Sequence, residues 1–330
     1  MKNHTGSTNI KYKYNIEMEN ERSNKEIMVQ LEAARVRGEI SMNPKYMEKL
    51  LQLKGFDIVI ICDDSGSMGE PSDYQPGGLR QSRFNELENT VKKVGIIANV
   101  IDNNGIDLLF LNSGIYKNVK DDASVSRIFN SVSLWGTPLC SAYRNFIKMY
   151  YPNTYDAARN SGVIPVRNMT KKLGLRKQTV HQGTDRTNPI LLIIATDGEP
   201  SDGSPEEFRR LMEVLNPPNL YRSIVACTGS EHVLKFLKSL DTLERTDVTD
   251  DFNSEKEVID RIQRVYDPSY NFSYDDYIAK ILLGSIDIEI DQLNDEETAF
   301  NRSKMPKTLG GSKKYRNKRN YTKKRRVLKH

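Results

Sequence analysis

The 330-residue chain has only three cysteines and four histidines, which argues against a site built from sulfur or imidazole ligands. The histidines are scattered through the sequence, and this spacing disfavours a zinc site. The cysteines are odd in number and form no C-x-x-C pair, and Cys62 and Cys227 fall within apolar runs where a buried cysteine is usual. We therefore expect a protein of a reducing compartment.

Long apolar runs are also missing, and no apolar segment at the N-terminus resembles a signal peptide. The longest apolar stretches have the length of a strand, which is too short to cross a membrane. We therefore expect an intracellular protein of the cytoplasm or the nucleus that is not secreted and binds no membrane.

Acidic residues are absent from the last 30 positions, which hold 13 lysines and arginines. The net charge of +5 thus conceals an acidic body, because residues 1–300 carry 36 basic and 44 acidic side chains. We expect 301–330 to be a disordered basic tail, whose clusters can attract the phosphate backbone of nucleic acid or act as a nuclear address. Tyr315 and Tyr321 could stack on unpaired bases. A solvated tail that keeps the acidic body soluble explains the same composition equally well.

From Phe56 onward, strand-like and helix-like runs alternate, which predicts an α/β fold with a mostly parallel sheet. The run 189–196 is apolar almost throughout, as in a strand that is buried on both faces. A helix that begins near Ser82 should bury one stripe of side chains. That stripe consists of Phe84, Leu87, Val91, Val94, Ala98 and Ile101.

The segments around this pattern predict the domain organisation. Residues 152–188 interrupt the alternation with seven lysines and arginines against two aspartates, so we expect a basic insertion loop there. Residues 286–290 alternate apolar and acidic side chains, which predicts a strand or extended segment. The expected parts are a disordered N-terminus at 1–17, a helical extension at 18–54, the main domain at 55–265, and a C-terminal helix with an extension at 266–300.

Three segments place oxygen-bearing side chains at the end of an apolar run or the start of a helix. Asp63, Ser65 and Ser67 follow the first strand, and Gly66 allows the tight turn that lets both hydroxyls converge. Thr137 precedes Pro138 at the expected N-cap of a helix, and Asp197 follows the central strand. The carboxyl ends of strands in open α/β sheets hold ligands and ions. These five oxygens suit Mg²⁺ or Mn²⁺ and no softer metal.

Each segment alone has a simpler explanation. Asp-Ser-Gly-Ser is a common turn composition, Thr137 alone is explained as an N-cap, and Asp197-Gly198 as a turn. The agreement of three separate loops is what favours a metal site. Three further acids close by in the sequence are interpreted as solvated charges that do not bind the ion directly: Asp64, Glu199 and Asp202.

The same residues resemble the metal-ion-dependent adhesion site of von Willebrand factor A-type (vWA) domains. Asp63-x-Ser65-x-Ser67, Thr137 and Asp197 match all five family positions in order, and the resemblance covers roughly residues 55–265. It is nearest to intracellular vWA proteins of the fungal and large-DNA-virus kind. The resemblance implies a doubly wound, Rossmann-like vWA fold. It also implies that the three hydroxyls bind the ion directly, that the two aspartates act mainly through water, and that an acidic side chain of a partner protein completes the coordination.

We therefore expect a metal-dependent protein-binding module and not an enzyme. A Mg²⁺-dependent phosphohydrolase is one alternative, but phosphatases of the haloacid type need a second aspartate where this chain has Ser65. The chain also has no G-x-x-x-x-G-K-[ST] loop for a nucleotide. The other alternative is a structural carrier for a nucleic-acid-binding tail at 301–330.

Overall fold

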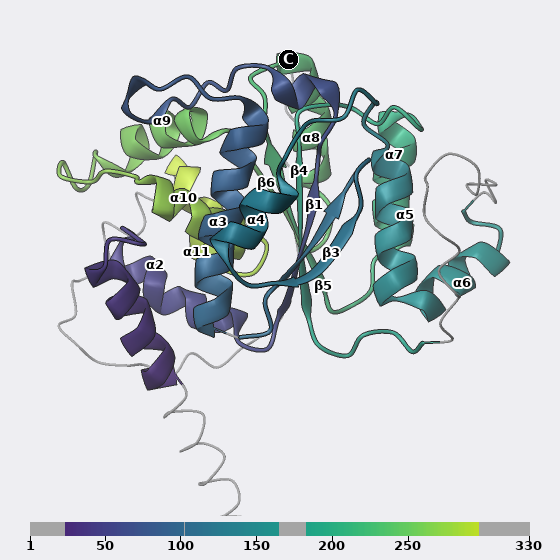
Figure 1. Cartoon of the computed structure of the whole chain (residues 1–330), viewed down its shortest axis with the longest axis horizontal. Helices are drawn as coiled ribbons and strands as arrows, with labels where there is room; N and C mark the ends of the chain where they lie inside the picture. Colours follow the sequence, from purple (N-terminus) through teal and green to yellow (C-terminus); the bar gives the residue numbers. More distant parts are fainter. Residues whose placement is uncertain (1–23, 102, 165–182, 297–330) are drawn as a thin grey trace, which may run out of the picture.

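The computed structural model describes residues 24–101, 103–164 and 183–296, which form one mixed sheet with helices on both sides (Figure 1). The strand order is β3-β2-β1-β4-β5-β6, and only β3 runs antiparallel to its neighbour. The predicted α/β class with a mostly parallel sheet is confirmed. The strands are β1 (Asp57–Cys62), β2 (Ile106–Phe110), β3 (Ile115–Val119), β4 (Ile190–Thr196), β5 (Leu220–Ala226) and β6 (Thr246–Thr249).

The two central strands, β1 and β4, place the predicted site. They pair in parallel from Asp57 opposite Ile190 to Cys62 opposite Ala195, so both end at the same edge of the sheet. The chain passes from β1 to β2 on one side, whereas β4 lies on the other side of β1. A crevice for ligands forms where the strand order changes direction in this way.

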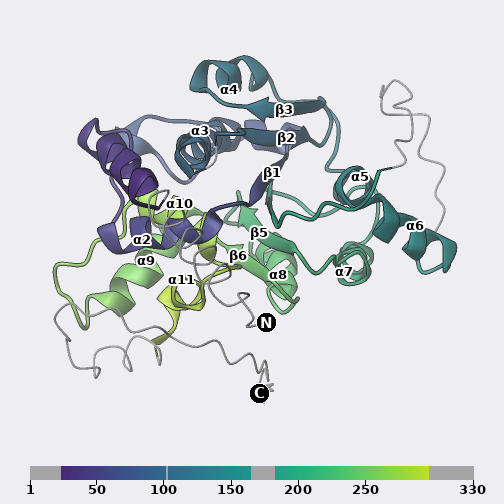
Figure 2. The same cartoon turned by 90° about the horizontal axis from the view of Figure 1, so that it is seen from below.

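The helix α3 (Arg83–Ile101) covers one face of the sheet, together with α10 (Tyr274–Leu283) (Figure 2). All six members of the predicted stripe on α3 are buried. Every residue of α10 after Tyr274 is buried as well, so the C-terminal segment contributes to the core of this face. The other elements of this side are a helix over residues 24–36, α2 (Pro44–Lys49), η1 (Leu50–Leu53), α4 (Asp122–Ile128), α9 (Phe252–Gln263), α11 (Ile288–Asp291) and η4 (Gln292–Asn294).

The opposite face is covered by α5 (Leu139–Tyr150), α7 (Pro205–Val214) and α8 (Glu231–Leu240), which enclose a second apolar core. The helix α6 (Pro152–Asn160) packs beside α5. Two short 3₁₀ turns, η2 (Gly66–Gly69) and η3 (Pro76–Gly78), lie between β1 and α3. No helix within the described ranges combines the length and the apolar character that crossing a bilayer requires.

Two local expectations are wrong. The first nine residues of the expected insertion loop are helical, because Pro152 occupies the first position of α6, where its missing N–H costs nothing. The expected strand at 286–290 is replaced by α11, because the Asp287 side chain accepts hydrogen bonds from the N–H groups of Glu289 and Ile290 and so caps a helix. Residues 1–17, 165–182 and 301–330, on which other expectations fall, lie outside the described residues.

Candidate metal centre

The first predicted loop leaves β1 with Asp63, which is fully buried. One carboxylate oxygen of Asp63 accepts a hydrogen bond from the N–H of Ser65 at 2.9 Å. The other oxygen accepts from the hydroxyl of Thr196 at 2.6 Å, and Thr196 is the last residue of β4. Asp63 therefore joins the ends of the two central strands.

The hydroxyls of the first loop extend this connection to the third loop. The Oγ atoms of Ser65 and Ser67 lie 3.2 Å apart, within hydrogen-bonding distance. The Ser67 hydroxyl donates to Oδ1 of Asp197 at 2.8 Å, across 130 positions of sequence. Four of the five predicted side chains are thus brought together by the structure, in one hydrogen-bonded group.

The fifth residue, Thr137, lies beside the third loop but does not cap a helix, so its predicted N-cap role is wrong. The helix α5 begins at Leu139, with Pro138 in the N-cap position and no side-chain cap from it. The Thr137 carbonyl accepts from the N–H of Ser201 at 2.9 Å. A methyl group built on Gly198 would come within 3.2 Å of the Thr137 hydroxyl. The hydroxyl therefore lies against the residue that follows Asp197.

The N-terminus of α5 is capped instead by Asp202. Its carboxylate accepts from the N–H groups of Cys140 and Ser141 at 3.1 and 2.8 Å, and from the Ser141 hydroxyl. Negative charge at a helix N-terminus is favourable, because the unpaired N–H groups there carry partial positive charge. Asp202 is partly exposed, but beyond the solvated charge that the sequence predicts it has a structural role, because this carboxylate fixes the loop that carries Thr137 to the start of α5.

Asp64 is not a solvated charge. It is fully buried, and its carboxylate accepts hydrogen bonds from the backbone and side-chain N–H groups of Asn112 at 2.9 and 3.1 Å and from the Ser113 hydroxyl. Asp64 therefore ties the first loop to the end of β2. Glu199 and Asp202 are both partly exposed, and Glu199 lies 3.2 Å from the imidazole of His232.

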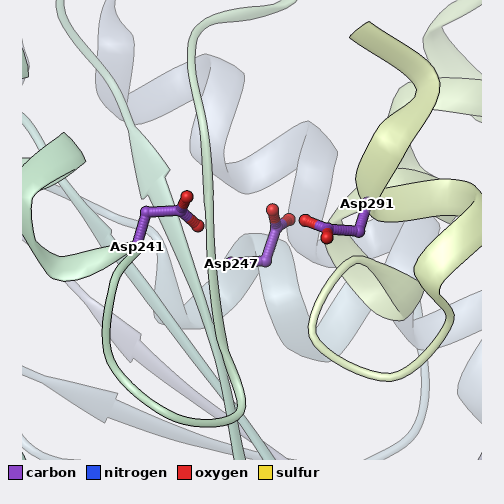
Figure 3. Close-up of side chains that lie close together, drawn as sticks. All are labelled: Asp241, Asp247 and Asp291. Atoms are coloured by element: carbon purple, nitrogen blue, oxygen red, sulfur yellow. The ribbon is translucent and has the colours of Figure 1, made fainter. Parts of the chain in front are cut away.

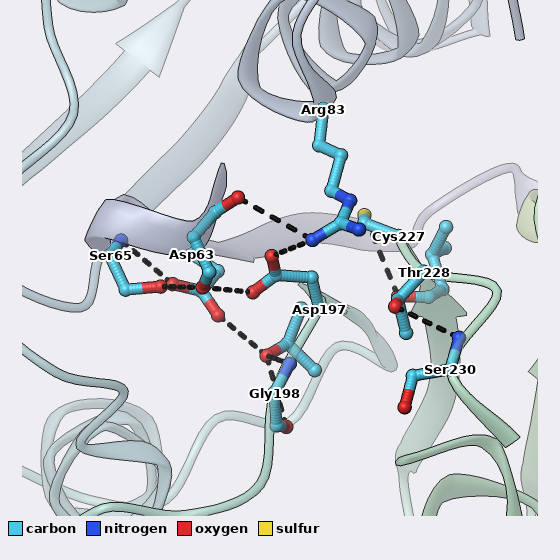
Figure 4. Close-up of polar contacts among 11 residues, drawn as sticks. Asp63, Ser65, Arg83, Asp197, Gly198, Cys227, Thr228 and Ser230 are labelled. Carbon is cyan, nitrogen blue, oxygen red and sulfur yellow. Dashed lines mark hydrogen bonds and ion pairs between the residues drawn. The ribbon is translucent and has the colours of Figure 1, made fainter. Parts of the chain in front are cut away.

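Arg83 is a residue of the site that the sequence pattern did not identify. Its Nη1 atom lies 2.8 Å from Oδ2 of Asp197 and 3.5 Å from the carbonyl oxygen of Ser67 (Figure 4). One signal was available in the sequence. Arg83 stands at the first position of a helix, where a positive charge is disfavoured. This position indicates that an acidic residue elsewhere in the fold pairs with it.

The site carries more negative than positive charge, and burial makes this charge costly. Burial raises the pKa of Asp63 to about 6, with Asp197 adding to the effect, although hydrogen bonds from Thr196 and Ser65 partly oppose it. Two buried carboxylates face one guanidinium here. Carboxylate and hydroxyl oxygens are the ligands that Mg²⁺ and Mn²⁺ prefer, so the donor set fits such an ion.

A second group of carboxylates lies elsewhere, away from the predicted site. Oxygen atoms of Asp241, Asp247 and Asp291 all lie within 4.8 Å of one another (Figure 3). The buried ammonium of Lys280 lies 3.8 Å from Asp247 and 4.0 Å from Glu255. Burial alone would lower the pKa of Lys280, but these carboxylates raise it. This group therefore already contains a cation from the chain itself, which joins α10 to β6.

Comparison with known proteins does not identify a family for this chain. No family matches the chain, and no curated protein matches it. One similar solved structure is proximal thread matrix protein 1 from the mussel byssus, with 12% identity over 62% of this chain and 46% of that one, and a TM-score of 0.38. Another is the manganese-loaded TRAP protein of Plasmodium vivax, with 14% identity over 61% of this chain and 71% of that one, and a TM-score of 0.33. The chain thus spans less than half of the mussel protein. Likenesses of this size carry no argument about function.

Proposed function

We propose that the chain is a vWA-type protein-binding module of the intracellular kind, which holds Mg²⁺ or Mn²⁺ between three loops. The observation that carries the proposal is the hydrogen bond between Ser67 and Asp197, together with the adjoining bonds of Asp63 and Ser65. It brings oxygens from the ends of β1 and β4 to one point. The strand order and the helices on both faces are those that a doubly wound vWA fold would have.

The composition of the site supports binding rather than catalysis. Three of its five oxygen donors are neutral hydroxyls, and the vWA resemblance implies that the two aspartates act mainly through water. An ion held there would then have few directly bound anions and would attract a carboxylate of a partner protein. A phosphohydrolase would need a further carboxylate that is free to move a proton. The adjacent carboxylate in the sequence, Asp64, is engaged by Asn112 and Ser113.

Calorimetric titration with Mg²⁺ and with Mn²⁺ tests the metal site. We expect the wild-type chain to bind the ion, and Asp63→Ala and Asp197→Ala to lose binding while keeping a folded circular dichroism spectrum. Asp156→Ala serves as a matched control, because it removes an exposed aspartate of α6 that is remote from the site in sequence. Equal affinities in the wild type and in both site variants would show that the site is misassigned.

The protein-binding role is tested by retention of partner proteins on the immobilised chain, once with Mg²⁺ and once with EDTA. We expect a set of partners that is retained only with the ion and is lost from Thr137→Ala. Partners that are retained equally under both conditions and by both chains would contradict the proposed role. A phosphatase assay with Mg²⁺ tests the alternative activity, for which we expect no turnover above that of Asp63→Ala.

A further inference from the structure

We propose that Arg83 is a built-in competitor of the divalent ion, a guanidinium that pairs with Asp197 and must release it for the ion to bind. This inference rests on the proposed function and adds to it a means of setting the affinity of the site. It follows from how both oxygens of Asp197 are used. Oδ1 accepts from Ser67 and Oδ2 accepts from Arg83, and the Asp197 side chain is fully buried.

The backbone of Arg83 is held in place, whereas its side chain has a route to solvent. The N–H of Arg83 donates to the carbonyl of Glu70 at 3.0 Å, and an isolated antiparallel bridge joins Pro71 to Ser82. These contacts fix the start of α3 beside the first loop. The side chain is 21% exposed, and the guanidinium meets the site through a single short contact, to Asp197. It can therefore leave Asp197 by rotation without any movement of the helix.

Charge balance explains why the guanidinium and the ion oppose each other. Without an ion, Arg83 neutralises one of the two buried carboxylates, which would otherwise repel each other. With a divalent ion also present, the same buried space would hold three positive charges against two negative ones. The ion and the guanidinium repel each other strongly in a site with little water. Binding of the ion therefore favours release of Arg83 from Asp197.

Substitution at position 83 separates competition from a merely structural role. Arg83→Gln removes the charge and keeps most of the side-chain length, and Arg83→Lys keeps the charge. Arg80→Gln is the matched control, because it removes the same charge from an exposed position three residues earlier. We expect Arg83→Gln to bind Mg²⁺ about tenfold more tightly in calorimetry, a size typical of coupling between two sites. Arg83→Lys and Arg80→Gln should stay within about threefold of the wild type.

A second measurement uses thermal unfolding of the same proteins. Arg83→Gln should melt at a lower temperature than the wild type in EDTA, because Asp197 loses its partner. Added Mg²⁺ should raise the melting temperature of this variant by more than it raises that of the wild type. If Arg83 had only a structural role, its substitution would lower the melting temperature in EDTA without enlarging the rise that Mg²⁺ produces. Unchanged or weaker Mg²⁺ binding by Arg83→Gln, when the wild type binds, would overturn the competition and leave the proposed function intact. Absence of Mg²⁺ binding in every variant, the wild type included, would overturn both.

A third measurement uses only the wild-type chain, so it does not depend on whether a variant folds. The side-chain N–H resonances of Arg83 in the ¹⁵N-labelled wild type report whether the guanidinium stays paired with Asp197. We expect these resonances to shift towards those of a solvated arginine as Mg²⁺ is added. If calorimetry shows binding and the resonances keep their ion-free positions, the guanidinium stays in place and the competition is refuted.

Discussion

Replacement of Asp63 by asparagine should stabilise the ion-free protein and at the same time remove its response to Mg²⁺. The side chain is fully buried, and burial raises its pKa from 3.8 to about 6. The folded chain therefore holds the proton more tightly than the unfolded chain does. Ionisation of Asp63 at pH 7.5 consequently costs stability, and this cost disappears as the pH falls from 6 to 3.8. Asparagine has no such cost.

The magnitude follows from the shift in pKa. A difference of about two units corresponds to about 3 kcal/mol at pH 7.5, which for a domain of this size is a rise in Tm of about 5 °C. Asparagine can keep both hydrogen bonds. Its oxygen accepts from Ser65, and its amide donates to Thr196, whose hydroxyl then turns to the carbonyl of Gly198, which lies 3.4 Å away. The substitution should therefore leave the local geometry intact.

The assay is thermal unfolding in EDTA and again in Mg²⁺ at about a hundred times its Kd. In Mg²⁺ the free energy of unfolding of the wild type should rise by about 2.7 kcal/mol, and its Tm by about 5 °C, because the ion binds only the folded chain. We expect Asp63→Asn to start higher and to gain almost nothing. A variant that melts no higher than the wild type in EDTA, and that gains as much from Mg²⁺, would refute the reasoning.

Three further predictions concern other parts of the chain. Burial raises the pKa of Glu86 from 4.5 to about 7, so Glu86→Gln should be about 3 kcal/mol more stable than the wild type at pH 8 in EDTA, and this advantage should vanish as the pH falls from 7 to 4.5. Denaturant unfolding measures this difference, and equal stability of Glu86→Gln and the wild type at pH 8 would contradict the prediction. Asp202→Ala removes the cap of α5 and should lower the free energy of unfolding by about 1–2 kcal/mol in urea titrations, so an unchanged value would exclude the capping role. Deletion of 301–330 should abolish retention of single-stranded nucleic acid at low salt in a gel-shift assay, and retention by the truncated chain would leave the tail as a solubility segment.

The sequence predicted the sheet and the three loops because both rest on local patterns. The stripe from Phe84 to Ile101 follows the helical period, and the apolar runs ending at Cys62 and Thr196 follow the pattern of buried strands. Because parallel strands end at a common edge, the convergence of Asp63 and Asp197 could be inferred without coordinates.

The parts that the sequence did not reveal depend on contacts between distant residues. Arg83 meets Asp197 across 114 positions, and Asp202 reaches the N–H of Cys140 across 62. Nothing in the neighbourhood of either residue specifies its partner. Asp64 looks identical in sequence to an exposed loop acid, and only the position of Asn112 at the end of β2 makes it a buried acceptor.

The central claim is that side-chain oxygens of three loops surround one divalent ion. Anomalous diffraction from a crystal of the chain grown with Mn²⁺ tests it most directly. We expect a peak at coordinating distance, about 2 Å, from the hydroxyls of Ser65, Ser67 and Thr137, with the Arg83 guanidinium turned away from Asp197. A peak among Asp241, Asp247 and Asp291 without one beside the serines, or a Thr137 hydroxyl that remains too far from the serines to share an ion, would contradict the account.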